Sequence, residues 1–236
     1  MSPAAPTLVL LHSPLAGPAS WGGLPEALRA AGREVITVDV CEDDEPPYAP
    51  RYVASVARQV NAAGPTGVVL VAHSGAGALV PALAIAQRAA HRPVRGYLFV
   101  DAVLPRWMPG NRLDLLRAED AETAAELREH LEAGGRFPTW TDAELAETIT
   151  DSEWRQAVLK DLHPRGLDFF TEALPLPVDW PDAPCGFVRT SAAYDVHARA
   201  AAARGWAVRL REGGHFAGCD DPGGLAAAVL DVAGPW

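Results

Sequence analysis

The stretch Val68-Val69-Leu70-Val71-Ala72-His73-Ser74-Gly75-Ala76-Gly77 is the part of the chain most diagnostic of its fold. Its apolar start predicts a buried strand, which runs into a small-x-Ser-x-small turn and a helix expected to begin near Gly77. The small residues Ala72 and Ala76 let the strand and helix pass closely. The turn would place Ser74 at a helix N-terminus, where developing negative charge is favoured. The pattern predicts a nucleophilic serine, with a non-catalytic strand-Gly-helix turn as the alternative.

Outward from this stretch, short apolar runs alternate with Ala-rich segments of helical composition. This alternation predicts a parallel α/β sheet with right-handed crossovers and helices on both faces. Six strands are expected, at residues 8–11, 35–39, 68–72, 97–100, 186–189 and 207–210. Helices are expected at residues 24–31, 51–61, 77–90, 197–204 and 225–232. With 49% hydrophobic and 21% charged residues, 236 residues can bury a sizeable core.

The segment from Arg106 to Trp180 breaks the alternation, because it contains no strand-like run. Residues 113–133 and 142–160 have helical composition there, which predicts an inserted helical cap. The chain would then divide into a first part of the core (1–105), the cap (106–180) and a second part of the core (181–236). Aromatic residues in the cap either attach its small helices to the body or line an apolar pocket. They include Trp107, Trp140, Trp154 and Trp180.

A second chemical signal lies near the C-terminus, where Gly213-Gly214-His215 follows the last predicted strand. A histidine on a glycine loop at this place can reach across the strand ends to Ser74. The chain order, nucleophile and then histidine, suits a Ser-His-Asp triad. The other histidines lack this setting: four are expected to face solvent and two to have structural roles. The first four are His91, His130, His163 and His197, and the last two are His12 and His73.

With these segments the chain resembles the α/β-hydrolase superfamily, in particular the small capped branch of plant methylesterases and hydroxynitrile lyases. The resemblance covers nearly the whole chain. It rests on residues 12–21 (HSPLAGPASW), the turn around Ser74, residues 99–105 (FVDAVLP) and residues 205–215. It implies the six-stranded parallel α/β-hydrolase sheet, flanked by helices and carrying an inserted helical cap.

Two carboxylates could complete the triad, since members of the superfamily take the acid from the loop after either of two strands. Asp195 follows the strand at 186–189, which is the commoner arrangement, but only 20 residues separate it from His215. It would also be a good helix N-cap. Asp101 ends the preceding strand, where a minority of members hold their acid, and it could alternatively be a buried carboxylate that orders a loop. We favour Asp101, because a strand end orients an imidazole more rigidly than a shortened loop.

The resemblance also implies an oxyanion hole made by the backbone N–H of Gly75 and an N–H from the loop after the first strand. Pro14 occupies that second position and has no N–H. The hole would keep one donor unless Leu15 or the hydroxyl of Ser13 supplies another. Loss of one donor costs on the order of 10² to 10³ in rate, which makes unusual chemistry more credible.

Charge and cysteine content limit the partners. The formal net charge of −10 and the absence of a basic run exclude nucleic acid and anionic membranes as partners. Three distant cysteines, at Cys41, Cys185 and Cys219, argue against a metal knuckle and a disulfide framework. The first apolar stretch is too short for a signal sequence or a membrane span, so a cytoplasmic location is expected. No metal or cofactor is required, and the oligomeric state stays open.

The sequence therefore predicts a serine hydrolase that cleaves an ester, thioester or lactone of a small to medium apolar substrate. Two alternatives remain. A lyase, cyclase or dehydratase of secondary metabolism could use Ser74 and His215 as a proton relay, and Pro14 makes this more credible. A hydrolase-like protein could instead bind a small ligand under the cap. A fluorophosphonate separates the hydrolase from the binder, because it labels an activated serine.

Overall fold

The computed structural model describes residues 5–41, 45–234 and 236. Within these residues, six strands form a single parallel sheet in the order β2-β1-β3-β4-β5-β6. The strands are β1 (Thr7–Leu11), β2 (Val35–Thr37), β3 (Val68–Ser74), β4 (Val94–Ala102), β5 (Cys185–Arg189) and β6 (Ala207–Leu210). The predicted fold, a six-stranded parallel sheet flanked by helices, is confirmed.

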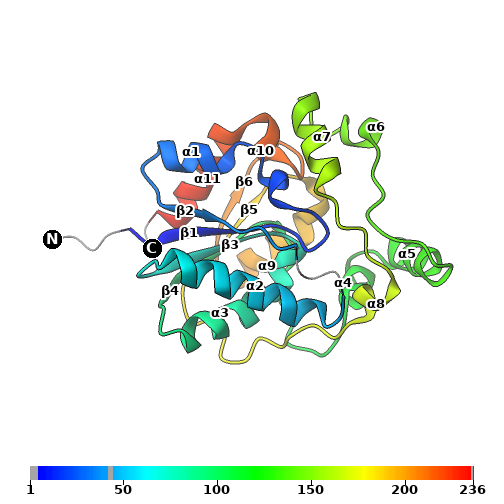
Figure 1. Ribbon diagram of the computed structural model, residues 1–236, viewed down its shortest axis with the longest axis horizontal. Helices are drawn as coiled ribbons and strands as arrows, with labels where there is room; N and C mark the ends of the chain where they lie inside the picture. Colours follow the sequence, from blue (N-terminus) through cyan, green and yellow to red (C-terminus); the bar gives the residue numbers. More distant parts are fainter. Residues whose placement is uncertain (1–4, 42–44, 235) are drawn as a thin grey trace.

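Helices cover both faces of the sheet (Figure 1). One face packs against α1 (Leu24–Ala30) and α11 (Pro222–Ala233). The opposite face packs against α2 (Tyr48–Ala63), α3 (Val80–Ala89) and α9 (Asp195–Ala203). Since β3 lies in the middle with apolar neighbours on both sides, its residues from Val68 to Ala72 are fully buried. This explains the continuous apolar run in the sequence.

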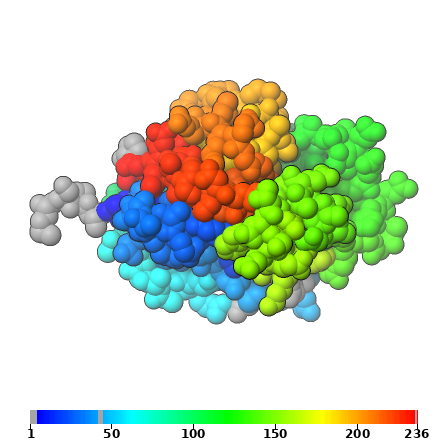
Figure 2. Space-filling model, turned by 90° about the horizontal axis from the view of Figure 1, so that it is seen from above, coloured from blue at the N-terminus to red at the C-terminus, as the bar shows by residue number. Residues whose placement is uncertain are grey.

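The segment between β4 and β5, residues 103–184, forms a helical insert. Its helices are α4 (Arg112–Glu119), α5 (Ala121–Glu132), α6 (Asp142–Leu145), α7 (Ser152–Lys160) and α8 (Leu167–Thr171). They lie beyond the carboxyl ends of the strands, and the space-filling view shows much of the insert as a green lobe beside the body (Figures 1 and 2). The insert contains the whole segment 106–180 that was predicted as a cap.

Each of the two stretches of helical composition in the insert, residues 113–133 and 142–160, forms two helices rather than one. The first is interrupted at Asp120, whose extended backbone ends α4 and whose carboxylate accepts the N–H groups of Glu122 and Thr123 to begin α5. The second is interrupted between α6 and α7, where Asp151 begins α7 in the same way. Asp side chains satisfy N-terminal N–H groups that a continuous helix would bond internally, so they favour a new start.

The helix after Ser74 also begins differently from the prediction. A 3-10 helix, η2 (Gly75–Leu79), precedes α3, which starts at Val80 and has Pro81 in its first turn. Proline is tolerated there because the first N–H groups of a helix have no internal partner. The remaining short elements are η1 (Pro18–Trp21), η3 (Ala192–Tyr194) and α10 (Ala217–Asp220). Both η3 and α10 lie next to the predicted site.

Candidate active site

Ser74 lies on a sharp turn at the carboxyl end of β3. Its backbone has φ 55° and ψ −128°, in the positive-φ region that costs a non-glycine residue about 1–3 kcal/mol. The turn passes so close to the end of β4 that a Cβ added to Gly77 would lie 2.0 Å from the carbonyl oxygen of Val103. Only glycine fits there. The Ser74 carbonyl accepts the N–H of Val103 at 3.1 Å, which ties the turn to the neighbouring strand end.

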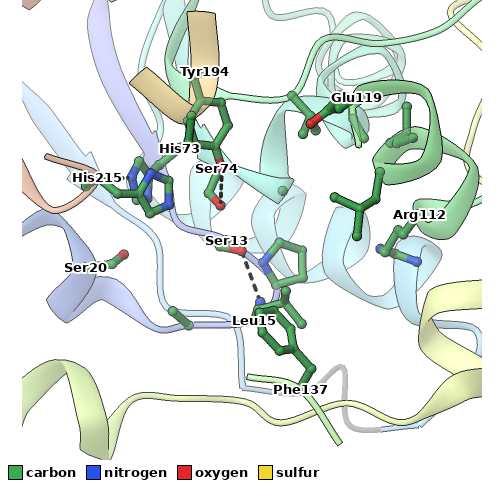
Figure 3. Close-up of a pocket in the computed structure, with 18 of the residues that line it drawn as sticks. Ser13, Leu15, Ser20, His73, Ser74, Arg112, Glu119, Phe137, Tyr194 and His215 are labelled. Atoms are coloured by element: carbon green, nitrogen blue, oxygen red, sulfur yellow. Dashed lines mark hydrogen bonds between the residues drawn. The ribbon is translucent and has the colours of Figure 1, made fainter. Parts of the chain in front are cut away.

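His215 lies on the loop after β6, and its ring stacks with two other rings, those of His73 and Tyr194 (Figure 3). The ring of His73 stacks on one face at a centroid distance of 4.4 Å, and the ring of Tyr194 lies parallel to it at 5.0 Å with an interplanar angle of 3°. His73 also donates its Nε2–H to the His215 carbonyl at 2.9 Å. These contacts fix the orientation of the His215 imidazole.

The surroundings of the His73 ring keep it uncharged. Burial, reinforced by the neighbouring His215, lowers the pKa of His73 to about 3. His73 therefore stays neutral at ordinary pH.

Asp101 faces the other edge of the His215 ring. Its Oδ2 lies 3.5 Å from His215 Nδ1 and accepts the hydroxyl of Ser191 at 2.6 Å, while Oδ1 accepts the N–H groups of Thr190 at 2.6 Å and Ser191 at 3.2 Å. Burial opposes ionisation of this carboxyl. The hydrogen bonds and the charge of His215 nevertheless hold its pKa below the usual range. An ionised carboxylate beside Nδ1 keeps a proton on that nitrogen and leaves Nε2 available as a base.

Asp195, the other candidate acid, lies away from His215. It pairs with Arg189 at 2.8 Å, and its side chain is 39% exposed. The predicted N-cap role is also wrong, because Tyr194 holds the cap position of α9 and makes no side-chain cap bond. The structure thus brings Asp101 to His215 and leaves Asp195 in a surface ion pair.

The four residues predicted for the oxyanion hole lie beside Ser74, but they are not equivalent. The N–H of Leu15 donates to Ser13 Oγ at 3.2 Å, so this amide is already engaged (Figure 3). A Cβ added to Gly75 would lie 3.3 Å from Ser13 Oγ and 3.6 Å from Cδ of Pro14. Gly75 and the Ser13 hydroxyl therefore face the same space. Since the Ser13 oxygen accepts the Leu15 bond, its own proton can be donated elsewhere.

A cavity of about 340 Å³ opens over Ser74. Ser74 and His215 lie at one side of it, with Arg112 and Glu119 on the opposite side (Figure 3). Most of the other wall residues contributed by the insert are apolar, and they include Leu115, Leu116, Phe137, Trp140, Phe169 and Phe170. The insert aromatics thus serve both predicted purposes: Trp140 lines the cavity, whereas Trp180 is buried against Tyr97 and Phe99 of the sheet.

Tyr194 is the site residue that sequence reasoning missed. Its hydroxyl lies 3.3 Å from Ser74 Oγ, and this is the one hydrogen bond of the Ser74 side chain among the described residues. Burial raises the pKa of the Tyr194 phenol, so the hydroxyl stays protonated. An aromatic residue in the loop where the commoner triad acid would lie was the available signal in the sequence.

The prediction that His197 faces solvent is wrong. His197 is buried, because α9 packs its first turns against the sheet. Its Nδ1 accepts the N–H of Leu104 at 3.3 Å, and its Nε2 donates to Glu119 at 2.8 Å. It therefore joins the end of β4 to the insert and holds Glu119 at the cavity wall. His12, predicted to be structural, is buried and accepts the N–H of Val40 at 3.0 Å.

Comparison with known proteins identifies the class. A model of the alpha/beta hydrolase family matches residues 8–228. The chain therefore belongs to the alpha/beta hydrolase family, and its interpretation as an enzyme of that family is confirmed. A search of curated proteins found no match. Within the part of the chain that the structure describes, no helix is long and apolar enough to span a membrane, and no cluster of three His, Cys, Asp or Glu side chains could hold a metal ion.

Solved structures with the same fold include methylesterase-like proteins. An extracellular alpha/beta-hydrolase from a Paenibacillus species, described as sharing structural and functional homology with tobacco salicylic acid binding protein 2, aligns with a TM-score of 0.75 and 18% identity over 96% of this chain and 98% of its own. Polyneuridine aldehyde esterase aligns at 0.68 and 16% over 98% and 100%. A thioesterase domain from the curacin biosynthetic pathway aligns at 0.60 and 15% over 97% and 92%. At these identities the likeness establishes the fold.

Proposed function

We propose that the protein is a serine hydrolase that cleaves an ester, thioester or lactone bond of a small to medium, largely apolar substrate. The observation that carries the proposal is the arrangement of Ser74, His215 and Asp101. A serine on a strained turn lies beside an imidazole whose Nδ1 faces a buried carboxylate, at one side of an apolar cavity. A Ser-His-Asp triad needs the serine, the imidazole and the carboxylate in this spatial order.

In the proposed reaction, Ser74 Oγ attacks the substrate carbonyl and its proton passes to His215 Nε2. Asp101 stabilises the resulting imidazolium through Nδ1–H. In the resting structure the Ser74 hydroxyl bonds to Tyr194 rather than to His215. Rotation about the Cα–Cβ bond of Ser74 would turn Oγ toward the imidazole, and resting enzymes often form this bond only when substrate is present.

The developing oxyanion would be stabilised by the Gly75 N–H and the Ser13 hydroxyl. Pro14 offers no N–H and the Leu15 amide is engaged, so the Ser13 proton is the second donor in reach of this space. The helix that begins after Ser74 adds the positive end of its dipole. A side-chain donor is less rigid than a backbone amide, so we expect a modest rate on activated esters for this fold.

The cavity supports the substrate class. Its volume of about 340 Å³ suits a small to medium molecule, and the apolar wall from the insert suits an acyl chain or an aromatic group. An esterase and a thioesterase domain are among the solved structures with this fold, which is compatible with an ester or thioester bond.

Covalent labelling tests the proposal. A fluorophosphonate should label the wild-type protein stoichiometrically at Ser74, and Ser74→Ala should abolish the label without unfolding the protein, since alanine can adopt the same turn. His215→Ala should slow labelling by about 10³-fold or more. Ser20→Ala is the matched control: Ser20 also borders the cavity, but its hydroxyl is bonded to the Gly17 carbonyl at 2.8 Å, so labelling should persist. A wild-type protein that is folded and unreactive would refute the hydrolase and favour the ligand-binding alternative.

One observation favours the second candidate, a lyase, cyclase or dehydratase that uses Ser74 and His215 as a proton relay. The loop after β1 presents no backbone donor from Pro14, and that of Leu15 is already bonded. Such a reaction needs no acyl intermediate and so depends less on an oxyanion hole. A protein that labels with the fluorophosphonate yet hydrolyses no ester, thioester or lactone in a broad panel would support this candidate.

A further inference from the structure

The Tyr194 hydroxyl lies beside both proposed reacting groups. It is 3.3 Å from Ser74 Oγ, and its ring lies parallel to the His215 ring at 5.0 Å. Tyr194 ends η3, on the loop after β5, and it lines the cavity. Neither contact is needed to anchor the tyrosine in an apolar core, so the position of the hydroxyl suggests a role in the reaction.

The hydroxyl lies on the opposite side of Ser74 from the proposed oxyanion hole. Figure 3 shows Tyr194 on one side of Ser74 and Ser13 on the other, with His215 next to Tyr194. A carbonyl oxygen that points to Gly75 and Ser13 therefore points away from Tyr194. The leaving oxygen must lie near His215, which protonates it, and Tyr194 is the hydroxyl next to that ring. Burial keeps the phenol protonated, so it acts as a hydrogen-bond donor.

We propose that Tyr194 is a catalytic residue that donates a hydrogen bond to the leaving oxygen of the substrate. The proposal rests on the proposed hydrolase function. In acylation, the bond from Ser74 Oγ to the carbonyl carbon forms and the Oγ proton moves to His215 Nε2. The bond from carbon to the leaving oxygen then breaks, and the Nε2 proton moves to that oxygen. Tyr194 keeps its proton throughout and stabilises the negative charge that develops on the leaving oxygen.

A role toward the leaving group makes a prediction that a structural role does not. An aryl oxygen is a good leaving group and needs little help, whereas an alkyl oxygen carries more charge in the transition state and needs a donor. Tyr194→Phe removes the hydroxyl and keeps the ring that stacks on His215. Hydrogen bonds to charged groups contribute enough to give about a 10- to 100-fold effect when one is lost.

The experiment compares kcat/KM of wild type and Tyr194→Phe on two butyrate esters, 4-nitrophenyl butyrate and ethyl butyrate. We expect a loss of about 10- to 100-fold on the ethyl ester and a much smaller loss on the aryl ester. Because kcat/KM reports the acylation step, a slow deacylation does not obscure the comparison. Equal losses on both esters would overturn the proposal, since that pattern indicates a merely structural role.

Two controls distinguish the proposed role of Tyr194 from the proposed hydrolase function on which it rests. Tyr194→Leu also removes the stack on His215 and should lower kcat/KM on both esters. The comparison with Tyr194→Phe therefore isolates the hydroxyl. If Tyr194→Phe and Tyr194→Leu lose the same activity on both esters, the proposed role of the hydroxyl is wrong. Fluorophosphonate labelling tests Ser74 independently. If wild type labels and hydrolyses esters but the selective loss is absent, the role of Tyr194 fails alone. If the wild-type protein neither labels nor hydrolyses esters, both the proposed function and the proposed role of Tyr194 are wrong.

Discussion

Asp101→Asn is the substitution that most directly tests the proposed triad, because it replaces one carboxylate oxygen by an amide NH2 group and removes the charge while keeping the shape. Oδ1 of the new side chain can still accept the N–H groups of Thr190 and Ser191. The amide nitrogen would replace Oδ2, which now faces Ser191 Oγ and His215 Nδ1. Ser191 can turn its hydroxyl to accept, but Nδ1 of His215 would have to accept as well. The imidazole proton would then lie on Nε2, where the base is needed.

Two magnitudes follow from this geometry. The wrong tautomer should lower kcat by about 10⁴, which corresponds to about 5 kcal/mol of transition-state stabilisation. The two N–H bonds that now end on a charged carboxylate would end on a neutral amide oxygen, and the Ser191 hydroxyl would accept from the amide instead of donating; each of these three bonds would be weaker by about 1 kcal/mol. A neutral amide costs less to bury than a carboxylate, which offsets part of this loss. The variant should therefore fold, with a free energy of unfolding lower by about 1–3 kcal/mol.

The assay is turnover of an ester together with urea unfolding, with Asp195→Asn as the matched control. Asp195 makes a half-exposed pair with Arg189, so its substitution should change stability by less than about 1 kcal/mol and kcat by little. An Asp101→Asn variant that keeps more than about a tenth of the wild-type kcat would refute the assignment of Asp101 as the acid. A severe loss in Asp195→Asn would instead require a rearranged loop in the working enzyme.

Three further outcomes are expected. Burial lowers the folded-state pKa of His73 to about 3 and also lowers the pKa of His12, so unfolding takes up protons in acid. The free energy of unfolding should therefore fall from pH 7.5 to 5.5, by about 1.4 kcal/mol from His73 and further from His12. Urea titrations at the two pH values measure this, and an unchanged midpoint would contradict it. Ser13→Ala should lower kcat/KM on esters by about 10²-fold. Pro14→Ala, added to Ser13→Ala, should recover part of this loss because it restores an N–H. Full activity of Ser13→Ala in steady-state kinetics would exclude the Ser13 hydroxyl as an oxyanion donor. Glu172→Gln should lower the free energy of unfolding by about 1 kcal/mol, because its carboxylate accepts the N–H groups of Tyr48 and Ala49 at the start of α2; thermal denaturation beside the exposed control Glu126→Gln checks this, and equal melting temperatures would argue against the cap.

The sheet was predictable because its signals are local. Each buried strand is a short apolar run, and a parallel strand with helices on both faces shows such a run without alternation. The interior of the insert was less predictable, since its helices are divided by single residues that can belong either to a helix or to a cap. The composition of the segment around Asp120 is compatible with one continuous helix. The side-chain bonds of Asp120 to the next turn decide otherwise.

The site was predictable where its residues lie in contiguous motifs. Ser74 and His215 each stand in a short stretch with a strand before it, and the structure brings both to one cavity. The choice between Asp101 and Asp195 needed the fold, because Asp101 lies at the end of β4 and Asp195 follows β5, and both strands end at the same edge of the sheet. The pairing of β3 with β4 shifts register between His73 and Ser74, and Asp101 takes φ 39°. No sequence pattern predicts that register shift.

The loop after β5 contacts Asp101 and also carries Tyr194. In the commoner arrangement the loop after β5 carries the acid. Here that loop instead offers the N–H groups of Thr190 and Ser191 to the carboxylate on β4. With Asp101 as the proposed acid, the loop need not present a carboxylate to His215, and η3 brings Tyr194 over the imidazole.

On the proposed mechanism, Pro14 and Tyr194 would affect different oxygens of the substrate. Pro14 offers no N–H on the side proposed for the carbonyl oxygen, whereas the Tyr194 hydroxyl lies on the side proposed for the leaving oxygen. A weaker oxyanion hole slows every ester, whereas help to the leaving oxygen matters only where that oxygen leaves poorly. The combination should narrow the rate difference between activated and unactivated esters. This combination would suit an enzyme whose natural substrate contains an alkyl ester or a lactone better than an enzyme that cleaves an activated acyl group.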